Sequence, residues 1–67
     1  MELVQQEHLP NGYLVSMYRR ENSPKNVVRV SYSGEVAQFD YYDANDAEIA
    51  FSVERDYYLR KRVKLRG

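Results

Sequence analysis

Carboxylates and a single histidine are the groups in this chain that could perform acid–base chemistry. His8 is the only histidine and there is no cysteine, so the sequence offers neither a Cys–His nucleophilic pair nor a thiolate metal site. Four carboxylates are close enough in sequence to pair for proton transfer: Asp40, Asp43, Asp46 and Glu48. Their spacing lacks the ligands and the glycine of an EF-hand loop, and two of them are better explained as helix-start signals. We therefore predict a protein that is not an enzyme and has no catalytic residue, metal or cofactor.

Tyrosine is the unusual residue of the composition, with seven copies and no tryptophan. Four of the seven are expected in or around the core: Tyr32, Tyr41, Tyr57 and Tyr58. Tyr18 and Tyr42 are instead expected on a sheet face turned away from the core, together with Arg20 and Arg29. Interleaved tyrosine and arginine can stack on bases and contact phosphates, or form a protein-binding hot spot. The alternative is an ordinary solvated face.

Alternating apolar residues and turn signals predict the elements that position these side chains. The turns are Leu9-Pro10-Asn11-Gly12, Ser23-Pro24-Lys25-Asn26 and Tyr32-Ser33-Gly34-Glu35. Apolar side chains occupy odd positions in 13–20, even positions in 27–33 and odd positions in 35–42. Because the connections are short, we predict a three-stranded antiparallel meander within 12–42, after an N-terminal segment, 1–11.

A helix is predicted over 43–58. Asp43 or Asn45 can cap it, and acidic residues in its first turn suit the helix dipole. Its apolar residues cover a broad arc that can lie on the apolar sheet face. The expected fold class is therefore α+β, with a helix packed on the sheet and with these residues buried together: Val15, Met17, Val28, Val30, Phe39, Ala50 and Phe51.

Two consequences of this packing can be tested. Replacing Phe39 with alanine should cost about 3–5 kcal/mol and unfold so small a domain. Three apolar residues, Leu14, Val27 and Val36, are expected to be exposed on the sheet face away from the helix.

The C-terminal segment, 59–67, breaks the helical pattern. Apolar residues there alternate with basic ones, which predicts either a fourth strand at the sheet edge or an extended basic arm. Its candidate contact residues are Arg60, Arg62 and Lys64.

Length and charge bound the class of protein. Sixty-seven residues make one domain, 1–67, with a stability margin of roughly 3–5 kcal/mol, so a homodimer is a reasonable expectation. The net charge is zero, which argues against strong non-specific binding to nucleic acid, although 35–56 is acidic and 57–67 is basic. Neither a signal peptide nor about 18 consecutive apolar residues is present, so we expect a cytoplasmic protein that does not contact a membrane.

The predicted helix opens with Tyr42-Asp43-Ala44-Asn45-Asp46-Ala47-Glu48-Ile49-Ala50-Phe51. Three strands followed by a helix with this opening resemble AP2-type DNA-binding domains and the similar arm-binding domains of phage integrases. The likeness lies in an aromatic residue followed by aspartate at the end of the third strand (Tyr42 and Asp43), in the acidic first turn of the helix, and in Ala47, Ala50 and Phe51. It implies a sheet face that enters the DNA major groove through Tyr18, Arg19, Arg20 and Arg29. This chain departs from the family by lacking tryptophan, by placing Asp40 on the same face and by adding a basic tail.

Two functions of different classes follow from the sequence. The first is DNA binding through the exposed sheet face; Arg20→Ala and Arg29→Ala would then each weaken binding and lower its salt dependence by about one phosphate contact. The second is a protein-binding or inhibitor module with an acidic, tyrosine-rich surface, of the kind that phages and mobile elements encode. A purely structural homo-oligomer is a third alternative.

Overall fold

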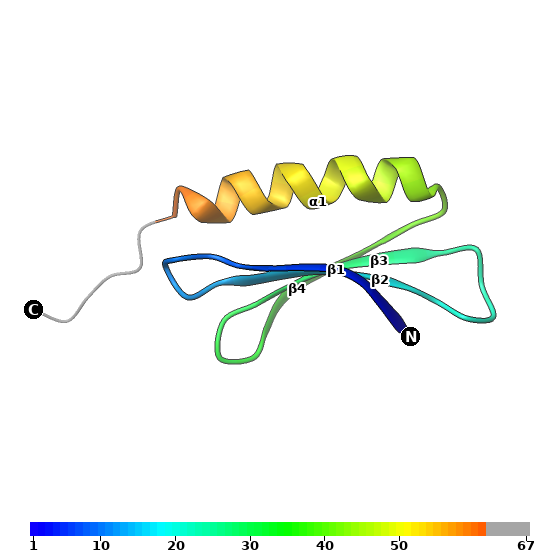
Figure 1. Ribbon diagram of the computed structural model, residues 1–67, viewed down its shortest axis with the longest axis horizontal. Helices are drawn as coiled ribbons and strands as arrows, with labels where there is room; N and C mark the ends of the chain where they lie inside the picture. Colours follow the sequence, from blue (N-terminus) through cyan, green and yellow to red (C-terminus); the bar gives the residue numbers. More distant parts are fainter. Residues whose placement is uncertain (62–67) are drawn as a thin grey trace, which may run out of the picture.

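The computed structural model describes residues 1–61, which form an open four-stranded antiparallel sheet and one helix (Figure 1). The elements are β1 (Glu2–His8), β2 (Leu14–Arg19), β3 (Asn26–Ser31), β4 (Glu35–Tyr41) and α1 (Ala44–Leu59). The strand order is β1-β2-β3-β4, so each strand pairs with its neighbour in sequence. In Figure 1 the helix runs along the length of the sheet on one side. The α+β class is confirmed, and no helix within 1–61 is long and apolar enough to span a membrane.

The predicted alternation in the three strands after the first turn is confirmed. Val15 pairs with Val30 across the ladder between β2 and β3, and Met17 pairs with Val28. All four side chains are buried in the cluster beneath α1. Directly opposed residues of an antiparallel pair share a face, so this register brings the apolar sets of both strands to the helix side.

The helix begins where the sequence predicts. The carboxylate of Asp43 accepts a hydrogen bond of 2.8 Å from the backbone N–H of Asn45, as an N-cap does. From there Ala47, Phe51 and Tyr58 turn one face of the helix into the core. The helix packs on β2, β3 and β4.

The predicted core is right except at its edge, and the expectation that Tyr32 and Tyr57 lie in or around the core is wrong, because they are 39% and 55% exposed. Phe51 is buried, but the Phe39 side chain is 37% exposed and Ala50 is only partly buried. Phe39 has the expected helix-side parity, opposite Val28. It remains accessible because β4 is an edge strand, with no neighbour on its far side within 1–61.

The N-terminal segment is a strand, which the sequence pattern did not predict. β1 pairs with β2 along its length, with an irregularity between Leu3 and Gln5. All seven of its residues are exposed, because α1 covers mainly the other three strands. With no buried face to require apolar residues at every second position, β1 carries no alternation that could reveal it.

The C-terminal prediction is only partly within the described residues. Helix α1 continues to Leu59, so the strand predicted to start there does not begin at that residue. Arg60 follows as the helix C-cap. Arg62 and Lys64 lie outside the described residues.

The turn between β1 and β2 holds the end of the helix. The side-chain amide of Asn11 donates hydrogen bonds to the carbonyl oxygens of Tyr58, at 2.7 Å, and Lys61, at 2.9 Å. The Tyr58 carbonyl also accepts a hydrogen bond from the backbone N–H of Lys61, at 3.2 Å, so Asn11 gives it a second donor and gives the Lys61 carbonyl, just beyond the helix, a side-chain donor. Gly12 has φ +102°, and a Cβ there would lie 2.8 Å from the Tyr32 ring, so the turn requires glycine.

Candidate binding surface

Within residues 1–61, no element covers the sheet face opposite α1, which we call the outer face. Cross-strand pairs place two rows of side chains on it. One row runs Leu3, Tyr18, Val27 and Asp40, and the other runs Gln6, Ser16, Arg29 and Gln38. Each row crosses all four strands, so residues distant in sequence lie side by side.

Arg29 is fixed at the centre of the outer face. Its guanidinium carbon lies 5.2 Å from the centroid of the Tyr18 ring, a cation–π arrangement. Its Nε and one terminal nitrogen donate hydrogen bonds of 3.1 and 3.0 Å to Oε1 of Gln38. Nε also lies 3.8 Å from a carboxylate oxygen of Glu35. The predicted neighbourhood of Tyr18 and Arg29 is therefore present, with three partners holding one guanidinium.

Arg20 contacts the same face at the end of the other row. A terminal nitrogen lies 3.6 Å from a carboxylate oxygen of Asp40. Its Nε is buried and has no hydrogen-bond acceptor within residues 1–61. Val27, which the sequence places on this face as an exposed residue, is fully buried. It lies between Tyr18 and Asp40 in the ladder, on a strand with a neighbouring strand on each side, so flanking side chains keep water away from it.

Tyr42 continues the outer face beyond the end of β4. The side chain is 72% exposed, and Nζ of Lys25 lies 5.2 Å from its ring centroid. Among the large apolar and aromatic residues of 1–61 this tyrosine is the most exposed, so much of its side chain is accessible to a partner.

The remaining candidate residues do not join this surface. Arg19 has the opposite parity from Tyr18 and lies 3.5 Å from Glu2, so its predicted place on the outer face is wrong. Arg60 lies at the end of α1, in the other layer of the molecule. Two further residues contact this surface. The parity of the third predicted strand already places Gln38 on this face, opposite Arg29, whereas no sequence pattern indicates Lys25.

The charges of the surface are largely compensated. All four arginines from 19 to 55 lie within 4 Å of a carboxylate: Arg19, Arg20, Arg29 and Arg55. His8 lies exposed at the end of β1, opposite Leu14. Within residues 1–61 there is no group of three or more His, Asp or Glu side chains that could hold a metal ion.

Comparison with known proteins leaves the function to be inferred from this surface. No protein-family model, no curated protein and no solved structure matches the chain. The resemblance to AP2-type and integrase arm-binding domains accordingly stays a prediction.

Proposed function

We propose that this domain is a non-enzymatic protein-binding module whose outer face is the contact surface. The observation that carries the proposal is the compensation of the cations on this face while its tyrosines and amides stay accessible. Arg20 and Arg29 each pair with a carboxylate, and Lys25 lies over the ring of Tyr42. What the face offers a partner is aromatic area and hydrogen-bonding groups rather than net positive charge.

Compensated charge favours a protein partner over nucleic acid. Affinity for DNA comes largely from cations that neutralise phosphates. A phosphate approaching Arg20 or Arg29 would also approach the carboxylate beside it, and the repulsion would offset much of the gain. Tyrosine and arginine are, by contrast, enriched among the residues that dominate protein–protein binding energy.

The arrangement of Arg29 supports the same conclusion. An arginine loses side-chain entropy when a partner immobilises it, and this loss weakens binding. Here Tyr18, Gln38 and Glu35 already hold the guanidinium. A partner that contacts Tyr18 and Arg29 would therefore meet a surface already in its bound arrangement.

Site-specific crosslinking tests the proposal. A photoreactive phenylalanine analogue would replace Gln38 or Tyr42 on the outer face, with Glu48 on α1 as the matched exposed control, in cells that naturally produce the chain. We expect both outer-face positions to form an adduct with the same protein and Glu48 to form none. Adding Tyr18→Ala to the Tyr42 probe should abolish that adduct. Adducts at Glu48 alone, or adducts that Tyr18→Ala leaves intact, would contradict the proposal.

A further inference from the structure

Helix α1 carries an exposed stripe on the side away from the sheet. The stripe consists of Asp46, Ile49, Val53, Tyr57 and Arg60. At 100° per residue these five positions fall within an arc of about 80°. Its three central side chains are 56%, 56% and 55% exposed, although all are large and apolar or aromatic. The buried face of α1, formed by Ala47, Phe51 and Tyr58, points elsewhere, so the fold of one chain does not use the stripe.

The stripe is symmetric in sequence about Val53. Ile49 and Tyr57 are each four residues from it, and Asp46 and Arg60 are each seven. At a rise of 1.5 Å per residue, these pairs lie about 6 Å and about 10 Å from the centre along the helix axis. The two inner positions are apolar or aromatic, and the two outer ones carry opposite charges. Such a pattern is complementary to itself when it is reversed.

We propose that a second copy of this chain docks on the stripe, with the two α1 helices antiparallel about a two-fold axis at Val53. In this arrangement Ile49 meets Tyr57 of the second copy and Val53 meets its own equivalent. Asp46 lies opposite Arg60 of the second copy, and the symmetry forms this ion pair twice. A two-fold interface requires one surface that matches itself, and the stripe meets that requirement in both apolar character and charge.

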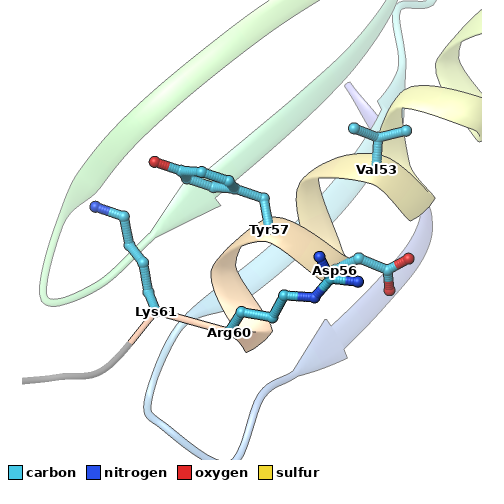
Figure 2. Close-up of a pocket in the computed structure, with 5 residues that line it drawn as sticks. All are labelled: Val53, Asp56, Tyr57, Arg60 and Lys61. Atoms are coloured by element: carbon cyan, nitrogen blue, oxygen red, sulfur yellow. The ribbon is translucent and has the colours of Figure 1, made fainter.

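A hollow at the C-terminal half of the stripe fits the same occupant. Val53, Asp56, Tyr57, Arg60 and Lys61 line an open cavity of about 510 Å³ (Figure 2). Its lining is apolar near Val53 and Tyr57, basic near Arg60 and Lys61, and acidic at Asp56, which is already 3.2 Å from Arg55. In the antiparallel arrangement, Ile49 of the second copy faces the apolar part and Asp46 of the second copy faces the basic part.

Residues beside the stripe do not oppose this pairing. Asp56 falls opposite Ala50 of the second copy and is already 3.2 Å from Arg55 in its own chain. Lys61 falls opposite Asn45 of the second copy. No two like charges therefore meet across the helices within residues 1–61. The outer faces of both copies point away from the interface. Dimerisation through α1 therefore uses a different surface from the proposed partner binding and leaves the outer face unobstructed.

Charge exchange tests the inference most sharply. Sedimentation of the wild type over a roughly hundredfold concentration range should approach twice the 8.0 kDa of one chain at the upper end. Asp46→Arg alone and Arg60→Asp alone should each stay monomeric, because each places like charges opposite one another twice. An equimolar mixture of the two should recover the dimer, since both ion pairs re-form in the heterodimer. Glu48→Arg, an equal charge change off the stripe, should dimerise as the wild type does.

A second pair of variants does not depend on charge. Val53→Asp should abolish the dimer, whereas Ser52→Asp, one position off the stripe, should preserve it. Both positions are exposed, so circular dichroism should show unchanged helix content. A wild type that remains monomeric throughout, a dimer that survives Val53→Asp, or a mixture that does not recover would each overturn the inference.

Discussion

Asn11 connects the first turn of the sheet to the end of the helix through two hydrogen bonds. We predict that Asn11→Ala lowers the free energy of unfolding by about 1–2 kcal/mol, because both hydrogen bonds from this side chain are lost and the Tyr58 carbonyl keeps only the Lys61 N–H. Urea denaturation followed by circular dichroism measures this directly.

Asn11→Asp gives that prediction a sharper form. The carboxylate is nearly the same size but cannot donate, and it would lie at the negative end of the helix dipole. We expect it to destabilise at least as much as Asn11→Ala. An aspartate variant as stable as the wild type would show that the two hydrogen bonds contribute nothing.

Tyr58 should make stability sensitive to alkaline pH. Burial raises the pKa of its phenol above the usual 10.0, and the Glu54 carboxylate adds to the effect. A raised folded-state pKa means that the neutral form is favoured in the fold. The stability that the fold gains from the neutral Tyr58 phenol is complete below about pH 10 and is lost as the pH rises through the folded-state pKa. Tyr58→Phe should therefore lose less stability above about pH 10 than the wild type, whereas Tyr42→Phe, changed at an exposed position, should behave as the wild type.

The two phenylalanines should differ strongly in their importance to the fold. Phe51→Ala should cost about 3–5 kcal/mol, which is comparable to the whole margin of a chain this size. Phe39→Ala should cost only about 1–2 kcal/mol, less than the sequence pattern alone predicts, because the side chain already keeps much of its contact with water. Thermal unfolding should show a cooperative transition for Phe39→Ala and none for Phe51→Ala; the reverse order would contradict the described core.

At the scale of elements, the sequence predicts what local alternation or capping encodes. Three strands and the helix are recovered because β2, β3 and the helix each bury one face and β4 partly buries Ala37 and Tyr41 on the same side, and Tyr18 and Arg29 are correctly placed together by the same alternation. β1 is missed since neither of its faces is buried. The bond from Asn11 to Tyr58 spans 47 residues, and no local pattern can reveal a contact between residues so far apart.

Amide hydrogen exchange tests the strand order. Within the described residues, β2 and β3 each have a neighbour on both sides, whereas β1 and β4 have one. We expect the slowest exchange in β2 and β3, and in β1 and β4 an alternation of protected and fast amides, because every second N–H of an edge strand points away from its partner. Fast exchange at every position of β1 would be incompatible with its pairing to β2.

At the scale of the whole molecule, the two layers present different surfaces. The described part is elongated, 46 × 20 × 15 Å, with α1 on one side and the outer face on the other (Figure 1). The stripe on α1 is the surface that we propose for a second copy, and the outer face offers tyrosines and compensated arginines. Helix pairing would therefore leave two outer faces directed away from each other, able to bind two partner molecules.

Whether the outer face recognises protein rather than nucleic acid can be tested by following backbone amide NMR signals during a titration with duplex DNA at low and moderate salt. We predict that the signals of Tyr18, Arg29 and Tyr42 do not move at either salt concentration. Shifts that cluster at these three residues at low salt and diminish as salt is added would contradict it, because they would show phosphates competing successfully for the paired arginines.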